Sequence, residues 1–343
     1  MMWVMKLWML VMVFMGVLAA EKETALKDHN HGEHKALCTV LKMVVGKWGS
    51  GGESLLEPLK TALHRTIFGN ESGGSLETLR NSLPKVYEEV VQDSDSRNMA
   101  CGQLRNDGND YHSIKQPRWS GHSAPHDLVC LCTLGNNSWP LDDTQTASTL
   151  CGQEKSALGS GKGNNGWSAI YTGKEQMEAT WANVTSKCLE GGGKGETLKA
   201  ALKEFTDKLV LKPIEGQKNR KQLGEGKPDE YYACTGSPTR GVCVMYYPKL
   251  TAHTWWVDLE KALKEDEQLQ KQREEEERRK NQEEAAKKDT NKTEDLKSTT
   301  PTTNQNEQNK TGTLHETMRK LNLTRSSSII LPSSWLLRAA FLF

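Results

Sequence analysis

The sequence predicts a mainly α-helical protein whose loops are held together by disulfides. Apolar residues recur at i, i+3, i+4 and i+7 in several stretches, which is the spacing of one helix face. All eight cysteines lie between residues 38 and 243, and the chain after them becomes strongly charged and then polar. We therefore expect a disulfide-stapled helical domain over residues 21–250, followed by a charged helix and a disordered tether.

Residues 1–20 have the pattern of a cleaved secretory signal peptide. One cation, Lys6, precedes an apolar run from Leu7 to Leu18, and small residues follow it. A signal anchor is the alternative, but the run is short for one. Export exposes the chain to an oxidising compartment, where an even number of cysteines indicates disulfides. The sequence does not fix their pairing; the cysteines are Cys38, Cys101, Cys130, Cys132, Cys151, Cys188, Cys234 and Cys243.

Helical spacing predicts three helices in the first part of the domain. Their apolar stripes cover residues 37–48, 55–67 and 76–90. The glycine-rich stretches GSGG and NESGG separate them. Pro84 is expected to kink the third helix, because proline cannot donate a backbone hydrogen bond.

The periodic pattern disappears over residues 93–172. Gly, Asn, Asp, Ser and Pro dominate this part, which also holds four cysteines. We interpret it as irregular loops held by disulfides. Helical spacing returns over residues 177–188 and 198–209, and a further loop runs through CTGSPTRGVC.

A last helix is expected to begin near Thr251, with an apolar face that includes Trp255 and Trp256. Beyond that face, KQREEEERRKNQEEAAKK contains five Glu residues followed by a cation at i+4. Each such pair stabilises a helix by ~0.2–0.5 kcal/mol, so the segment can stay helical in water without a core. We expect a charged helix over residues 251–290, either a partly frayed solvated helix or a stalk.

The C-terminal part is polar and then apolar. Residues 291–326 lack a core pattern and indicate a disordered, glycosylated tether. The chain ends SSSIILPSSWLLRAAFLF. As a helix, Ile329 to Phe343 would reach only ~22 Å, against roughly 30 Å for a bilayer core. Three interpretations stay open for residues 327–343: a cleaved lipid-attachment signal, a weak tail anchor, or a C-terminal core helix.

The chain has six Asn-x-Ser/Thr sequons, which are glycosylation acceptors in an exported protein. The last three lie in polar sequence and should be accessible. The expected sites are Asn70, Asn136, Asn183, Asn291, Asn309 and Asn322.

Two stretches resemble ligand-binding motifs. HNHGEH places His29, His31 and His34 close together, but this spacing does not converge on one helix face, so we expect no metal site. GSGKGNNGW lacks the hydroxyl residue that follows lysine in a phosphate-binding loop, and no strand is predicted before it. We interpret it as an exposed loop.

Other chemistry is also weakly indicated. Cys130-Leu131-Cys132 lacks redox-motif spacing, so two different disulfides are expected there. Neither G-x-S-x-G nor H-E-x-x-H occurs. The net charge is +1, and the charges at residues 260–290 alternate in sign, which argues against nucleic-acid binding. We expect no enzyme activity and no cofactor.

The whole layout resembles the variant surface glycoproteins (VSGs) of African trypanosomes. The parts that carry the resemblance are the early helix with Cys38, the loop-rich middle, the EEEERRK helix and the tail SSSIILPSSWLLRAAFLF. The chain has no cysteine after Cys243, whereas the best-known members have a cysteine-rich C-terminal domain. The resemblance therefore points to the type that lacks this domain.

The resemblance implies an elongated antiparallel helical coiled coil or bundle that forms a homodimer. It also implies a glycosylphosphatidylinositol (GPI) anchor in the outer leaflet of the plasma membrane. Such a coat shields the parasite surface from host antibodies and takes part in antigenic variation. Small residues followed by an apolar tail form a GPI signal, so attachment is expected at Ser326, Ser327 or Ser328, with Thr324 and Asn322 as further possibilities.

Two rival functions remain. The first is a GPI-anchored uptake receptor of the same architecture, of the haptoglobin–haemoglobin or transferrin type. Tryptophan is enriched at binding hot spots, although filling a thin core is the favoured role for these side chains. The tryptophans considered as anchors for such a receptor are Trp119, Trp139, Trp167, Trp255 and Trp256.

The second rival is a surface enzyme.

Overall fold

The computed structural model describes most of the domain and the charged helix. The described residues are 27–92, 95–105, 116–141, 148–161, 166–168, 171–192, 197–248 and 253–294, with side chains of the last helix described as far as residue 287. The expected signal peptide, most of the tether, the C-terminal tail, Asn309, Asn322 and Ser326 to Ser328 lie outside them. The chain divides into two compact units, Met1–Glu277 and Arg278–Phe343.

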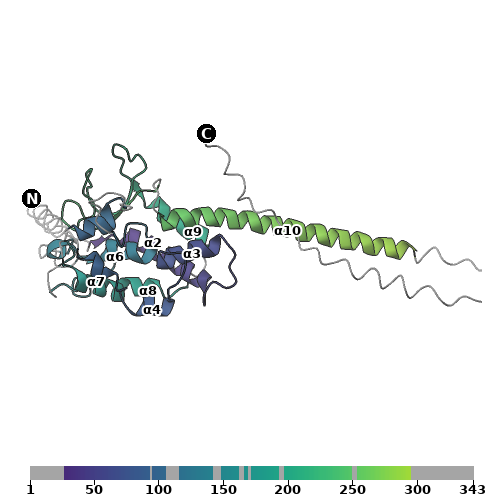
Figure 1. The fold of residues 1–343 in the computed structure, drawn as a ribbon, viewed down its shortest axis with the longest axis horizontal. Coiled ribbons are helices and arrows are strands. Elements are labelled where there is room, and N and C mark those ends of the chain that lie inside the picture. Colours follow the sequence, from purple (N-terminus) through teal and green to yellow (C-terminus); the bar gives the residue numbers. More distant parts are fainter. Residues whose placement is uncertain are drawn as a thin grey trace, which may run out of the picture. The chain divides into compact units, whose positions relative to one another are not determined.

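The described chain is mainly helical, as the sequence predicts (Figure 1). The α-helices are α2 (His31–Trp48), α3 (Leu59–Phe68), α4 (Leu76–Asn81), α5 (Tyr87–Val90), α6 (Ala124–Cys132), α7 (Lys174–Thr180), α8 (Ser186–Cys188), α9 (Leu198–Asp207) and α10 (Trp255–Glu294). Shorter helical turns are η1 (Asn98–Gly102), η2 (Asn136–Ser138) and η3 (Trp181–Thr185).

Helix α2 is the element predicted over residues 37–48. It buries one face, which includes Leu37, Leu41 and Val44, and packs against α9, α3 and α6. The helix stops at Gly49, which adopts a φ of +60° and donates its N–H to the carbonyl of Val45. Glycine reaches this backbone region without steric penalty. The GSGG break in the sequence therefore acts as the expected helix terminator.

Two of the predicted helices are shorter than their apolar stripes. The stripe over residues 55–67 forms a helix only from Leu59, because Pro58 occupies the N-cap position and disfavours helical backbone before it. The helix predicted over residues 76–90 is wrong as a continuous element. It is divided into α4 and α5, and Pro84 lies between them.

Helix α6 corrects the prediction that residues 93–172 contain only irregular loops. Every one of its nine residues is buried, so no polar face marks it in the sequence. Its start signal is local: the Ser123 side chain accepts a hydrogen bond from the His126 N–H, and proline stands in the first turn. Ser at the N-cap with proline just after it is a common helix start.

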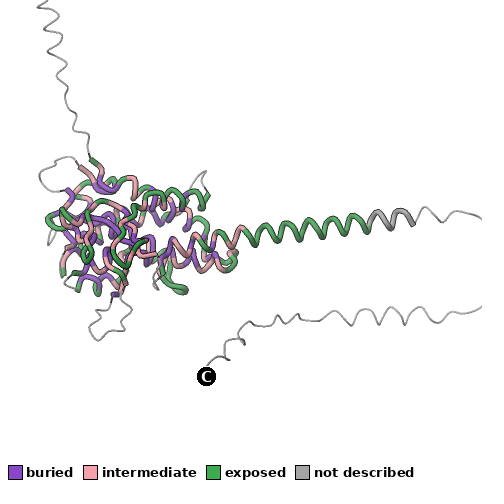
Figure 2. The backbone as a smooth tube through the Cα atoms, turned by 90° about the horizontal axis from the view of Figure 1, so that it is seen from above, coloured by how far each residue is buried: buried purple, intermediate pink, exposed green. Residues whose placement is uncertain are grey.

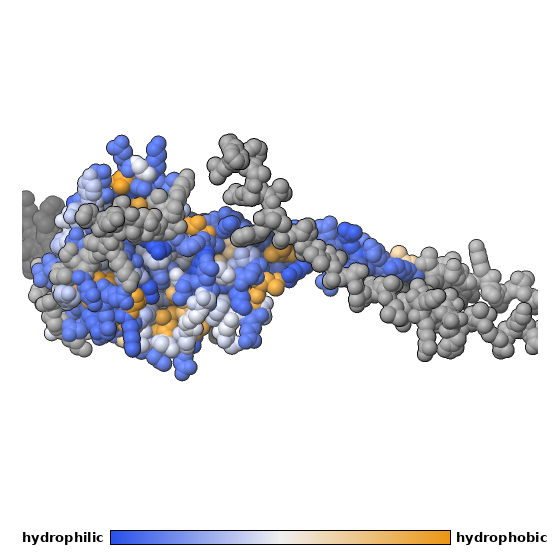
Figure 3. Space-filling model, viewed as in Figure 1, coloured by the Kyte–Doolittle hydropathy of each residue, from blue (hydrophilic) through white to orange (hydrophobic). Residues whose placement is uncertain are grey.

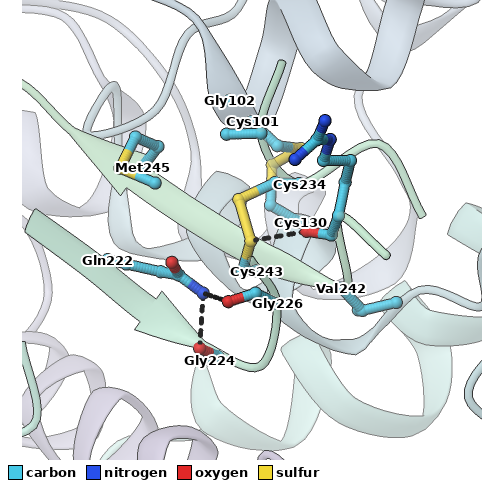
Figure 4. Close-up of a disulfide and its surroundings, with 12 residues drawn as sticks. Cys101, Gly102, Cys130, Gln222, Gly224, Gly226, Cys234, Val242, Cys243 and Met245 are labelled. Atoms are coloured by element: carbon cyan, nitrogen blue, oxygen red, sulfur yellow. Dashed lines mark hydrogen bonds between the residues drawn. A yellow bond between two sulfur atoms is a disulfide. The ribbon is translucent and has the colours of Figure 1, made fainter. Parts of the chain in front are cut away.

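Short strands, which the sequence did not predict, complete the fold. Strands β1 (Asp28–His29) and β2 (Thr149–Leu150) pair in parallel. Strands β3 (Val210–Leu211), β4 (Lys221–Gly224) and β5 (Cys243–Tyr246) form an antiparallel sheet in the order β3-β4-β5. Figure 4 shows the Cys234–Cys243 disulfide beside this sheet, with the Gln222 amide donating to the carbonyls of Gly224 and Gly226.

The first turns of α10 are fixed to the domain. Phe205 of α9 lies 5.1 Å from the Trp255 ring, and Lys199 pairs with Glu267 at 2.7 Å, so α9 and this part of α10 run antiparallel. The helix begins four residues later than predicted, and residues 268–287 are all exposed (Figure 2). Figure 3 shows their surface as mostly hydrophilic. Among the described helices, none has the length and apolar character required to cross a bilayer.

All eight cysteines are paired. The disulfides are Cys38–Cys188, Cys101–Cys130, Cys132–Cys151 and Cys234–Cys243. The prediction that Cys130 and Cys132 belong to two different disulfides is confirmed. Together the two bonds hold both neighbouring loops to the end of α6.

We predict that the Cys38–Cys188 disulfide stabilises the fold more than the Cys234–Cys243 disulfide. The first joins residues 150 positions apart and the second residues nine apart. From chain entropy alone, replacing both cysteines of the first pair by serine should lower the free energy of unfolding by about 5 kcal/mol, against about 3 kcal/mol for the second pair. Chemical denaturation of both double variants measures this. Equal losses would contradict loop closure as the main cause.

Candidate functional site

A fully buried guanidinium, that of Arg97, lies at the centre of the loop-rich part of the chain. Its Nη1 donates to the carbonyls of Leu134 and Trp167, at 3.2 and 3.1 Å. Its Nη2 donates to the carbonyls of Cys130 and Thr133, both at 2.9 Å. Carbonyls at a helix C-terminus lack helical partners and carry partial negative charge. The guanidinium therefore caps α6 and holds the Trp167 loop to it.

The charge of Arg97 persists despite its burial. Burial lowers the pKa of Arg97 to about 9, which still leaves the group protonated at neutral pH. Its guanidinium carbon also lies 5.2 Å from the centre of the Trp167 ring, where the ring face attracts a cation. Among the residues that the structure describes, carbonyl dipoles and an aromatic face thus take the place of a carboxylate partner.

A buried carboxylate, that of Asp127, fastens the start of α10. Its Oδ2 accepts hydrogen bonds from the Tyr246 hydroxyl at 2.9 Å and from Trp255 Nε1 at 2.7 Å. Its Oδ1 accepts from the backbone N–H of Gly121 at 2.9 Å, and the Gly121 carbonyl accepts from the Trp255 N–H. Burial raises the pKa of Asp127 to about 7, against these three hydrogen bonds. Asp127 therefore joins α6, β5 and α10.

A buried histidine, His126, continues this polar core. Its Nδ1 accepts from the Tyr87 hydroxyl at 2.8 Å, and its Nε2 donates to the Ala100 carbonyl at 3.0 Å. This pattern requires the neutral ring, and burial lowers the pKa of His126 to about 3. Burial also lowers the pKa of His122 well below its usual value and raises that of Tyr87. These buried groups can hold elements together, but a substrate cannot reach them.

The three histidines of HNHGEH have separate neighbours. His29 Nδ1 lies 2.8 Å from a Glu225 carboxylate oxygen, and His31 Nδ1 lies 2.6 Å from Asp28. His34 Nε2 lies 4.0 Å from the sulfur of Cys188, and burial lowers the pKa of His34 to about 4. The structure therefore does not bring these histidines together around one point.

Two other groups place a histidine and two cysteines close enough to share an ion. They are His34 with Cys38 and Cys188, and His126 with Cys101 and Cys130. In both groups the two cysteines form a disulfide. The metal-binding form of cysteine is the thiolate, so neither group fits a metal while its disulfide is intact.

The structure describes only part of GSGKGNNGW, the stretch that resembles a phosphate-binding loop, because Lys162 lies outside the described residues. Before it, residues 155–161 form turns that pack on α7 and η2. Gln176 donates to the Gly159 carbonyl at 2.9 Å, and the hydroxyls of Ser160 and Ser138 lie 2.9 Å apart. Of the described residues of GSGKGNNGW, Gly161 is exposed, whereas Gly159, Gly166 and Trp167 are buried, so the interpretation of the whole stretch as an exposed loop is wrong.

Three of the five tryptophans considered as binding anchors are buried: Trp167, Trp255 and Trp256. This confirms for them the interpretation that they fill the core. Trp119 is half-buried, lies 3.9 Å from the Arg105 guanidinium and donates its indole N–H to the His253 carbonyl. Trp139 is also half-buried.

The described sequons differ in access. Asn70 follows the end of α3 and Asn136 starts a short turn, and both side chains are exposed. Asn183 is half-buried within η3, and its amide nitrogen donates to the Ala157 carbonyl at 2.8 Å. Asn291 belongs to α10, where its side chain lies outside the described part.

Sequence reasoning missed Arg97 and Asp127. The available signal for Asp127 was a lone carboxylate in APHDLVCLC, an otherwise mostly apolar stretch that follows the helix-start residue Ser123. Arg97 has no comparable local signal, because all four of its carbonyl partners are at least 33 residues away along the chain.

The family model described as the trypanosomal VSG domain matches residues 44–285. No curated protein matches the chain. The matched range runs from within α2 into the exposed part of α10, and it includes Arg97 and Asp127.

We predict that acid destabilises the fold through His126. When a histidine has a lower pKa in the folded state than in the unfolded state, where it is about 6.5, the folded protein loses stability as the pH falls below 6.5. Given the folded-state pKa of about 3, this loss should reach about 2 kcal/mol between pH 7 and pH 5. Asp127 opposes it, because a raised carboxyl pKa favours the folded state as pH falls.

The variant His126→Gln isolates this contribution, since an amide can donate and accept without titrating. Its free energy of unfolding should fall by about 2 kcal/mol less than that of the unchanged protein over the same pH interval. Denaturant titrations at pH 7 and pH 5 measure the difference. The exposed His253→Gln serves as the matched control, and parallel pH curves for His126→Gln and the unchanged protein would contradict the prediction.

Proposed function

Because the chain belongs to the trypanosomal VSG domain family, a family of surface coat proteins, we propose that it is a GPI-anchored coat glycoprotein. In this role it shields the parasite plasma membrane and, through replacement by other variants, evades host antibodies. The observation that carries the proposal is the family match, which covers most of the chain.

The chemistry of the described domain supports a shielding role rather than catalysis. Its most perturbed titratable groups, such as Asp127 and His126, are buried and hydrogen-bonded to the fold. Four disulfides restrain the loops, which favours resistance to unfolding and proteolysis. Exposed loops tolerate sequence change, so those within residues 102–172 are the natural epitopes.

The C-terminal part supplies the attachment in this proposal. The exposed end of α10 acts as a stalk, since i,i+4 Glu–cation pairs support a helix without a core. The tether follows, and the anchor is joined at Ser326, Ser327 or Ser328 after removal of residues 327–343 or a shorter tail. The antiparallel contact between α9 and α10 supports an elongated helical bundle. The homodimer is part of the proposal through family membership alone.

The receptor alternative has less support. Burial removes Trp167, Trp255 and Trp256 from any ligand surface. Trp119 and Trp139 stay partly accessible, but Trp119 is occupied by Arg105 and by its hydrogen bond to His253. A coat role needs no such anchor, so we favour it over uptake of a host protein.

Treatment of intact cells with phosphatidylinositol-specific phospholipase C tests the proposal. We expect the released chain to be the most abundant protein of the cell surface, counted in copies per cell. Release of only a few copies would retain the anchor but favour a receptor. Absence of release, with the sequence SSSIILPSSWLLRAAFLF still present by mass spectrometry, would contradict the anchored coat.

We also predict selective glycosylation of the folded domain. A glycan on Asn70 or Asn136 would extend into solvent, whereas one on Asn183 would compete with the hydrogen bond to Ala157. Mass spectrometry of the purified variants should show that Asn70→Gln and Asn136→Gln each carry one glycan fewer than the unchanged protein. Asn183→Gln, the matched control, should keep the glycan mass of the unchanged protein, and loss of a glycan there would contradict the prediction.

A further inference from the structure

The loop between β3 and β4, residues 212–220, forms a hydrogen-bonded tip that no part of the proposed coat function uses. Its turn is closed by the Gln217 N–H, which donates to the Ile214 carbonyl at 3.0 Å. Gly216 lies in this turn with a φ of +75°, a conformation that favours glycine in a tight turn. The backbone N–H groups of Lys212 and Arg220 add hydrogen bonds across the tip. The tip is therefore a preformed structure.

Arg220 places a buried positive charge inside this tip. Only 3% of its surface is exposed. Its Nε donates to the Lys212 carbonyl at 2.7 Å and its Nη1 to the Asp229 carbonyl at 2.9 Å. The neighbouring Tyr247 hydroxyl donates to the Gly102 carbonyl at 2.9 Å. Within the described residues no carboxylate forms an ion pair with Arg220, so its charge is offset by neutral oxygens alone.

A hollow of about 310 Å³ opens beside the tip, and Arg220 is one of its lining residues. Its lining brings together two cations, Lys218 and Arg220, with the amides of Gln217 and Asn219. Tyr247 and Pro248 supply an apolar wall, and no acidic residue belongs to the lining. Lys218 is exposed, and no ion-pair partner is found for it in the part of the chain that the structure describes.

The composition of this lining selects a ligand class. Guanidinium and ammonium groups bind phosphate and sulfate oxygens by charge-assisted hydrogen bonds, and amide N–H groups add neutral donors. The tip carries three cations and one carboxylate, Glu215, so it attracts anions. A hollow of this size is within the range of small-molecule sites, and an apolar wall suits a ring.

We propose that this hollow, named the hairpin-tip site, binds a small ring that carries a phosphate or sulfate group, such as a phosphorylated or sulfated sugar. Arg220 and Lys218 receive the oxyanion, and Tyr247 and Pro248 contact the ring. The inference does not depend on the coat function, because it concerns a site on the folded domain whatever its surface abundance.

Isothermal titration calorimetry of the full mature chain tests the site. The probes are glucose 6-phosphate, glucosamine 6-sulfate, inorganic phosphate and inorganic sulfate, with glucose as the uncharged comparison. We expect saturable binding of both sugar esters and none of glucose. Tighter binding of the esters than of the free ions supports recognition of the ring, whereas equal affinities would overturn the ring contact and leave an anion site.

Two single variants separate the site from general charge attraction. Lys218→Glu should weaken binding of the sugar esters at least tenfold, since it replaces a lining cation by an anion. Lys227→Glu makes the same charge change at an exposed lysine outside the lining and should change affinity less than about twofold. Asn219→Asp, which places a carboxylate in the lining, should also weaken binding.

The outcomes are decisive because the substitutions at Lys218 and Lys227 lie on the surface, and unchanged thermal unfolding will show that each variant is folded. Equal weakening by Lys218→Glu and Lys227→Glu would overturn the site in favour of diffuse electrostatics. Lack of saturable binding of every charged probe by the unchanged protein would overturn it entirely. Neither result would affect release by the phospholipase, so failure of this inference is distinguishable from failure of the coat proposal.

Discussion

The fold depends on the hydrogen bonds that the Arg97 guanidinium donates to four backbone carbonyls. A buried charge without such partners would be strongly unfavourable. Conversely, removing the guanidinium would leave the carbonyls of Cys130, Thr133, Leu134 and Trp167 without this donor. Because these carbonyls lie at the end of α6 and in a distant loop, one side chain joins the end of α6 to the Trp167 loop.

This constraint connects the fold to its proposed use. Irregular loops cannot bury enough apolar surface to order themselves, and here two disulfides and Arg97 restrain them from within. The determinants of loop position are therefore buried. Residues on the outer surface can change without disturbing them, which is the property that a family of antigenically distinct shields requires.

The regular helices were predictable and the polar core was not. Helices α2 and α9 each bury one face, so their spacing alone reveals them. Helix α6 is buried on all sides and loses that signal. The two-residue strands β1, β2 and β3 are too short to show alternation. Arg97 and Asp127 act through partners far away in the sequence, which no local pattern encodes. Of the candidate sites, the disulfides of Cys130 and Cys132 followed from spacing, whereas their partners required the structure.

Hydrogen–deuterium exchange of Arg97→Met, compared with the unchanged protein and with the exposed-site control Lys227→Met, tests the central role of Arg97 most directly. The account predicts faster exchange at residues 133–141 and 166–168, next to the carbonyls that lose their donor, while α2 and α9 stay protected. Lys227→Met should leave both regions unchanged. Unaltered protection of residues 133–141 and 166–168 in Arg97→Met would contradict the account.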